Sequence, residues 1–102
     1  MTESQASISV WATETFGDAS SNARVAARAN EEMAELLLHL TADDRSPAAI
    51  EEAADIVIIL YRLADRMGKD LLAEVDRKMA INRKREWNVT SCGHGYHKRE
   101  KS

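Results

Sequence analysis

Apolar residues recur at helical spacing along most of the chain. Between residues 21 and 40 they lie three or four positions apart, which predicts a helix with one apolar face. These residues are Ala26, Ala29, Met33, Leu36, Leu37 and Leu40. Ser46 and Pro47 favour the start of a second helix over residues 47–67, because serine caps helices and proline suits their first turn. A third helix is predicted over residues 71–86, after Gly68 and a capping Asp70.

The two ends of the chain carry weaker patterns. A short helix is predicted over residues 9–16, with Trp11 on it and Gly17 at its end. Residues 88–102 have no apolar period, and they are predicted to form a flexible C-terminal tail or lid. The sequence therefore predicts one all-α helical domain over residues 1–87, built as an antiparallel bundle.

The second predicted helix is apolar on nearly all sides. Its apolar residues are Ala53, Ala54, Ile56, Val57, Ile58, Ile59, Leu60, Tyr61, Leu63 and Ala64. A helix of this kind is buried on most sides, and the other helices of one short chain cannot easily cover it. We therefore expect a homodimer or homotetramer, with a four-helix core completed by homodimerisation. The alternative is a monomeric three-helix bundle.

Composition and charge limit the cell compartment and the kinds of partner that the protein can have. The net charge is -3, which argues against binding to a nucleic-acid polymer through bulk charge. The single cysteine, Cys92, fits a reducing compartment. No apolar run reaches the length of a membrane span, and the first residues lack a signal-peptide core. These features predict a cytoplasmic protein without a membrane partner.

Two pairs of acidic residues stand out on the first two long helices. Glu32 and Glu35 are three residues apart and share one face, as do Glu52 and Asp55. A short connection makes the two helices antiparallel neighbours, so the pairs can meet. Four carboxylates in one place repel one another unless cations compensate, and oxygen ligands suit Mg²⁺ or Mn²⁺. The alternative is a solvated acidic face, but both pairs border buried apolar runs, where an unpaired charge is costly.

Basic and polar residues form a stripe on the third predicted helix. Lys78, Asn82 and Arg85 follow the spacing i, i+4, i+7 and lie on one side. Cationic donors beside a metal site would suit a polyphosphate. The alternative is a solvated basic face near the end of a helix, where lysine and arginine are favourable in any case.

Together these motifs resemble a known family. The chain resembles the MazG-like all-α nucleoside triphosphate pyrophosphohydrolases in the order and spacing of three motifs. These are Glu32-x-x-Glu35, then after sixteen residues Glu52-x-x-Asp55, and then the segment Lys78-Met79-Ala80-Ile81-Asn82-Arg83. The resemblance covers about residues 11–87. The segments around Trp11 and from Gly93 to His97 look more like the dATP/dGTP pyrophosphohydrolase branch, which is often found in phages.

The resemblance implies an enzyme that cleaves a nucleoside triphosphate between its α- and β-phosphates, giving a monophosphate and pyrophosphate. Mg²⁺, with Mn²⁺ as a substitute, would be held by Glu32, Glu35, Glu52 and Asp55. A metal-bound water would attack phosphorus, and no separate side-chain base is assigned.

The same resemblance implies the substrate contacts. Lys78, Asn82 and Arg85 would contact phosphate or sugar, with Arg83 a weaker candidate. A purine deoxynucleotide such as dGTP or dATP is the expected substrate. Apart from the resemblance, Trp11 and Phe16 are aromatic, so one of them, with Trp11 as the candidate, would stack on the base. The alternative is that both pack the short N-terminal helix onto the bundle.

Three alternatives compete with this function. A carboxylate-bridged di-iron bundle normally carries Glu-x-x-His on two helices, and this sequence has no Glu-x-x-His. Two further alternatives stand beside it. One is a non-catalytic dimeric adaptor or regulatory subunit with a solvated acidic face, which has no need to gather both acidic pairs with the basic stripe. The other is a zinc site at Cys92, His94 and His97, which lacks a matching second half. A lid that touches phosphate suits this tail better than zinc does.

Overall fold

The computed structural model describes residues 2–85, 87–89 and 95–97. The described elements, in chain order, are α1 (Gln5–Phe16), α2 (Asn22–Ala42), α3 (Pro47–Arg66), α4 (Leu71–Lys84), β1 (Trp87–Val89) and β2 (Gly95–His97). The chain divides into two compact units, Met1–Leu71 and Leu72–Ser102. Each unit is described by itself, and the single domain over residues 1–87 stays a prediction.

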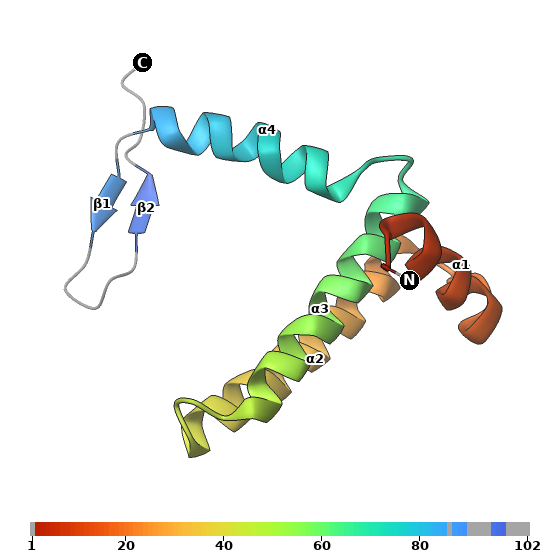
Figure 1. The fold of residues 1–102 in the computed structure, drawn as a ribbon, viewed down its shortest axis with the longest axis horizontal. Coiled ribbons are helices and arrows are strands. Elements are labelled where there is room, and N and C mark those ends of the chain that lie inside the picture. The colour runs from red at the N-terminus through yellow and green to blue at the C-terminus, as the bar shows by residue number, and fades with distance from the viewer. Residues whose placement is uncertain (1, 86, 90–94, 98–102) are drawn as a thin grey trace. The chain divides into compact units, whose positions relative to one another are not determined.

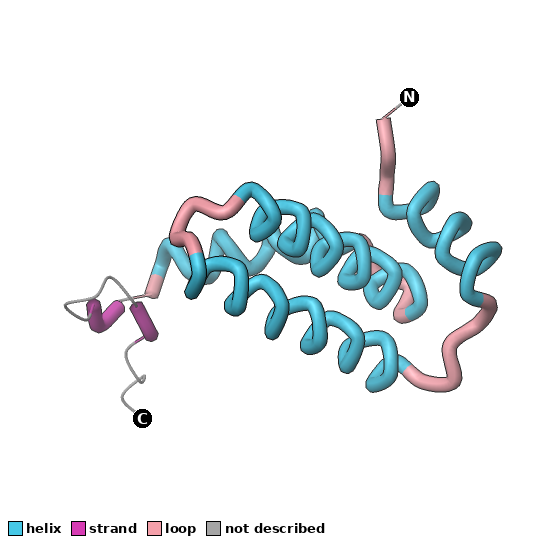
Figure 2. The backbone as a smooth tube through the Cα atoms, turned by 90° about the horizontal axis from the view of Figure 1, so that it is seen from below, coloured by secondary structure: helices cyan, strands magenta, loops and turns pink. Residues whose placement is uncertain are grey.

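Helices α2 and α3 form the antiparallel hairpin that the sequence predicted, and they lie side by side in both views (Figure 1, Figure 2). Ser21 caps α2 through its side chain, which accepts a hydrogen bond from the Arg24 amide. The connection between the helices is tight, because the Ser46 amide donates to Asp43 O at 3.0 Å. Pro47 occupies the first turn of α3, as expected. The predicted all-α class is thus confirmed for residues 5–84, which contain the four helices.

Helix α1 starts at Gln5 rather than at residue 9. Ser4 and Ser7 explain the earlier start, because each side chain accepts a hydrogen bond from the backbone amide of the other. This reciprocal capping satisfies two amides that would otherwise be unpaired. Gly17 ends the helix with a positive φ of 75°, a conformation that favours glycine.

Helix α1 lies beside the C-terminal part of α3 (Figure 1), and polar contacts join α1 and the residues after it to α3. The Ser9 hydroxyl donates to Asp65 Oδ2 at 2.6 Å, and Arg62 donates to Gly17 O at 2.7 Å. Arg66 forms an ion pair with Asp18 at 2.7 Å. Polar contacts therefore help to hold α1 in place, together with the buried Ala12.

The core of the first unit is thin. Its buried apolar residues are Ala12, Val25, Ala49 and Ala64, and no described side chain is completely enclosed. Larger residues of the hairpin face outward, with Ile50 72%, Leu38 71% and Val57 45% exposed. Apolar surface of this kind is typical of a face that another molecule covers.

The second unit contains α4 and a pair of short strands. Strands β1 and β2 are antiparallel, with Asn88 opposite Tyr96. The Trp87 indole donates to Asn82 O at 2.9 Å and so joins the strands to the end of α4. The sequence pattern did not predict this pairing, because three residues are too few to show an alternating period.

None of the helices in the described ranges is long and apolar enough to cross a membrane. Cys92 and His94 lie outside the described residues, so the zinc alternative is not tested and the tail or lid stays a prediction.

Candidate metal centre and pocket

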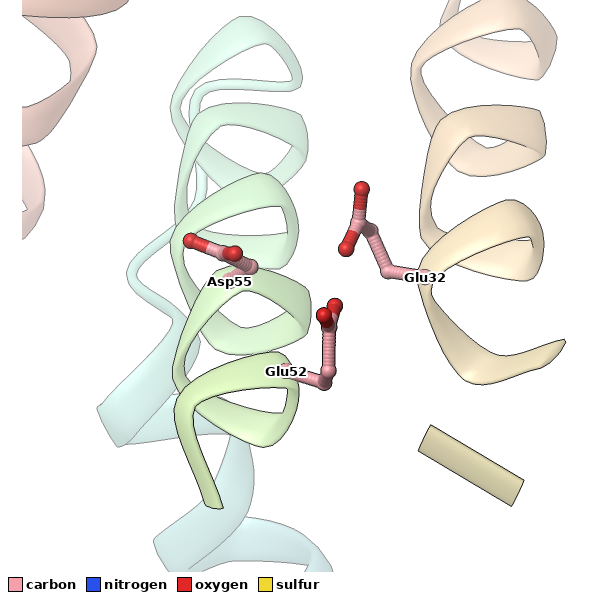
Figure 3. Close-up of side chains that lie close together, drawn as sticks. All are labelled: Glu32, Glu52 and Asp55. Atoms are coloured by element: carbon pink, nitrogen blue, oxygen red, sulfur yellow. The ribbon is translucent and has the colours of Figure 1, made fainter. Parts of the chain in front are cut away.

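Three carboxylates meet between the two helices of the hairpin. Glu32 comes from α2, while Glu52 and Asp55 come from α3, and Figure 3 shows Glu32 and Glu52 directed into the space between them. One oxygen of each lies within 4.8 Å of the others. We call these three residues the carboxylate cluster. The helical spacing of Glu52 and Asp55 places both on the side of α3 that faces α2.

The cluster changes the protonation of Glu52. Hydrogen bonding with the Glu32 side chain, loss of solvent and the negative charges of Glu32, Glu35 and Asp55 raise the pKa of Glu52 to about 7. Like charges close together disfavour the ionised form, so Glu52 holds its proton to a higher pH than an isolated glutamate does.

The donor set fits a hard divalent cation. Glu52 Oε2 is buried and has no hydrogen-bond partner among the described residues. Glu32 is 6% exposed, which makes it the one buried charged residue in the described part of the chain. Buried carboxylates need a compensating charge, and oxygen ligands are those that Mg²⁺ and Mn²⁺ prefer.

Two cationic or titratable side chains border the cluster. Arg28 lies one turn before Glu32 and contacts Glu32 Oε1 at 2.7 Å, while its other nitrogen contacts Glu31 at 2.7 Å. His39 Nε2 lies 3.7 Å from Glu52 Oε1. Arg28 thus offsets part of the charge of Glu32 and restrains its side chain.

A pocket of about 360 Å³ opens beside the cluster. It is lined by Trp11, Ala12, Phe16, Ala19, Arg24, Val25, Arg28, Glu32, Asp55, Ile58, Ile59 and Arg62. Two cluster members, Glu32 and Asp55, therefore form part of its wall. The pocket has a charged end at the cluster and apolar walls from α1, α2 and α3, which is a common composition for a small-molecule site.

Three further lining residues, Trp11, Phe16 and Arg62, form what we call the aromatic end of the pocket. The Trp11 and Phe16 rings meet edge to face, with centroids 5.4 Å apart and an interplanar angle of 83°. The Arg62 guanidinium lies 5.9 Å from the centre of the Phe16 ring. Trp11 is 51% and Phe16 65% exposed, so these rings do not simply pack α1 onto the bundle.

Comparison with known proteins adds to this geometry. Residues 28–94 match the model of the MazG-like family. The chain belongs to the MazG-like family. Among solved structures, a cyanophage S-2L MazG-like pyrophosphohydrolase bound to dGDP and three catalytic Mn²⁺ ions per active site is similar, with 31% identity and a TM-score of 0.75. The match covers 95% of this chain and 91% of that one.

The family prediction is therefore confirmed, and both matches support the enzyme class it implied, a nucleotide pyrophosphohydrolase. A search of curated proteins finds no match.

The structure of this MazG-like chain brings some of the expected site residues together and leaves others apart. The structure brings Glu32, Glu52 and Asp55 together, while Glu35 is exposed and lies outside the close group. Glu35 is still near enough for its charge to help raise the pKa of Glu52. Trp11 lines the pocket, as its expected role requires.

The expected phosphate contacts lie in the second unit of this MazG-like chain, Leu72–Ser102. Lys78 is exposed, whereas Asn82 and Arg85 are half-buried. Their proximity to the carboxylate cluster stays a prediction.

Sequence reasoning missed the arginines of the pocket. The i, i+4 spacing of Arg28 and Glu32 was a signal that could have shown their ion pair. Arg62 had a weaker signal, because its spacing of seven residues from Asp55 places both on one face of α3. Nothing in the sequence, however, indicated that Arg62 would meet Phe16 across the fold.

Proposed function

We propose that this MazG-like chain is a divalent-metal-dependent nucleoside triphosphate pyrophosphohydrolase. It cleaves a purine deoxynucleoside triphosphate, such as dGTP or dATP, to the monophosphate and pyrophosphate. The observation that carries this proposal is the shared wall: two carboxylates of the cluster and the Trp11 ring line one pocket. An acidic centre beside an aromatic wall suits a ligand with a metal-bound phosphate chain and a flat base.

Glu32, Glu52 and Asp55 would hold the metal, Mg²⁺ in the cell with Mn²⁺ as a substitute, and Glu35 would serve as a further ligand. The bound ions would neutralise the triphosphate and activate water for attack. The related phage enzyme holds three Mn²⁺ ions per active site, which supports more than one ion here. A fourth carboxylate close to the cluster is consistent with that number.

The remaining residues bind and orient the substrate. Arg28 keeps Glu32 directed into the cluster through its 2.7 Å contact. Ile58 and Ile59 of α3 give the pocket an apolar wall, and Trp11 stacks on the base. Restraint of this kind places the α-phosphate against the cluster, which lowers the entropic cost of reaction.

Lys78, Asn82 and Arg85 are proposed to contact the phosphates or the sugar. Lys78 and Asn82 lie one turn apart on α4, and Arg85 follows directly after its end, which supports this role. The buried Asn82 Oδ1 has no hydrogen-bond partner within the described ranges and is an acceptor suited to a sugar hydroxyl. Cationic donors there would stabilise charge on the departing pyrophosphate.

We also propose that the chain acts as a homodimer or homotetramer. The exposed apolar residues of α2 and α3, among them Leu37, Leu38 and Ile50, support a partner copy that covers them. A cytoplasmic location is proposed as well, because nucleoside triphosphates are found there.

The deciding experiment compares Glu52→Gln with Glu51→Gln. Purified protein is incubated with Mg²⁺ or Mn²⁺ and each common nucleoside triphosphate, and the products are separated. We expect monophosphate plus pyrophosphate from the wild type, loss of both in Glu52→Gln, and retention in Glu51→Gln, since Glu51 is exposed and outside the cluster. No turnover by folded wild-type protein with either metal would favour the non-catalytic adaptor.

A further inference from the structure

The aromatic end of the pocket contains a fixed arginine that neither the metal centre nor the phosphate contacts require. Arg62 lies seven residues after Asp55 on α3, which is about 10.5 Å along the helix axis. Both residues line the pocket. A nucleotide whose phosphates sit at the carboxylate cluster would extend its base in the direction of Arg62.

Arg62 is held in place before any ligand binds. It donates to Gly17 O at 2.7 Å, and its guanidinium lies 5.9 Å from the centre of the Phe16 ring. A guanidinium has five N–H donors, and no second hydrogen bond of this side chain forms within the described part of the chain. Arg62 therefore has donors left for a ligand, and its orientation is already fixed.

The other two arginines of the pocket are less suited to reading a base. Arg28 is engaged by Glu31 and Glu32 next to the cluster. Arg24 is exposed, and it donates a hydrogen bond to the Ser21 hydroxyl through its backbone amide rather than through its side chain. Of the three, Arg62 combines a position restrained by Gly17 O with a contact to the Phe16 ring of the pocket.

We propose that Arg62 selects guanine-type bases by donating two hydrogen bonds to O6 and N7 of a 6-oxopurine. This inference rests on the proposed function, and it adds the residue that sets base preference. The planar fork of arginine matches the two acceptors of guanine. Adenine presents N7 together with an amino donor, which would face the arginine donors and leave them unpaired.

The test measures kcat/KM for dGTP, dITP, 7-deaza-dGTP and dATP with wild-type protein and Arg62→Lys. Lysine keeps the charge but lacks the fork. We expect Arg62→Lys to lower kcat/KM for dGTP and dITP about 10- to 100-fold, the value of a bidentate base contact, and to change dATP by about twofold or less. The wild type should lose a similar factor on 7-deaza-dGTP, which lacks the N7 acceptor, and Arg62→Lys should lose little more.

The matched control is Arg66→Lys. Arg66 lies one turn further along α3 and does not line the pocket. It contacts Asp18 and Ala19 O in the connection between α1 and α2, and Asn22 at the start of α2. It should leave the ratio of dGTP to dATP unchanged. An equal loss on all substrates in Arg62→Lys, or a wild type that prefers dATP, would overturn the proposal while leaving the pyrophosphohydrolase function intact.

Equilibrium binding of dGMP, 7-deaza-dGMP and dAMP, measured by calorimetry, separates the two proposals further. If no triphosphate is cleaved, the proposed function fails, and tighter binding of dGMP than of either analogue would still support Arg62 as the base-reading residue. Equal binding of the three monophosphates, or no binding, would refute that role. Because this measurement uses the wild-type protein, it also tests the base contact if Arg62→Lys does not fold.

Discussion

The two ends of the pocket are built in different ways. The carboxylate cluster takes its members from the α2–α3 hairpin, and each position follows from helical spacing within that hairpin. The aromatic end joins Trp11 and Phe16 of α1 to Arg62 of α3, far apart in the sequence. The first end needs only two adjacent helices, whereas the second needs α1 to be held by polar contacts. The proposed chemistry is therefore encoded locally, and the proposed selectivity depends on tertiary structure.

The largest effect should come from removing a charge in the carboxylate cluster. Glu32→Gln should lower kcat/KM at least about 100-fold, because a metal site contributes several kcal/mol and each 1.36 kcal/mol is tenfold in rate. Glu35→Gln, outside the close group, should cost about tenfold. Pyrophosphate release under saturating Mn²⁺ measures both. Equal losses would show that Glu35 is as central as Glu32.

A change at the aromatic end should affect the nucleotide and not the metal. Trp11→Ala should raise KM about 5- to 100-fold, since base stacking on an aromatic side chain contributes roughly 1–3 kcal/mol. Its affinity for Mn²⁺ should be unchanged. Val10→Ala is the control, because Val10 is 57% exposed on the same helix and does not line the pocket. A parallel loss of metal affinity in Trp11→Ala would mean that the two ends are not separable.

The pH dependence of the Tm tests the raised pKa of Glu52 in the carboxylate cluster. In metal-free protein the folded state holds the Glu52 proton more tightly than the unfolded chain, because its pKa is raised from 4.5 to about 7. The resulting preference for the folded state is present below pH 4.5 and is lost as the pH rises to about 7. The Tm of Glu52→Gln should therefore exceed that of the wild type by an amount that grows across this window.

Thermal unfolding in the presence of a chelator tests this expectation. Added Mn²⁺ should reverse the difference above pH 7, because it binds the ionised cluster of the wild type. Parallel curves for the two proteins across the window would contradict the proton assignment.

The smallest effect should follow from loosening α1. Ser9→Ala removes the 2.6 Å hydrogen bond to Asp65, an exposed contact expected to stabilise the protein by about 1 kcal/mol. We expect KM to rise about fivefold or less, which is the factor that 1 kcal/mol supplies, and Mn²⁺ affinity to stay constant. Thr13→Ala on the same helix is the control. A larger effect on Mn²⁺ than on KM would contradict a separate role for α1.

The sequence by itself determined the family and the helical hairpin. The spacing of the two acidic pairs predicted that four carboxylates meet, because periodicity and a short connection leave two helices few ways to pack. The structure brings Glu32, Glu52 and Asp55 together and leaves Glu35 outside the close group. The start of α1 was less predictable. It depends on a reciprocal serine cap at Ser4 and Ser7 rather than on an apolar pattern.

Only the tertiary structure decided the aromatic end of the pocket. Arg62 reaches Gly17 and Phe16 because α1 turns back at a glycine with positive φ and is hydrogen-bonded to α3. The periodicity of a single segment contains no information about such contacts. They depend on where two helices from distant parts of the chain are held, and here individual polar contacts hold them, with few buried apolar residues to leave a sequence pattern.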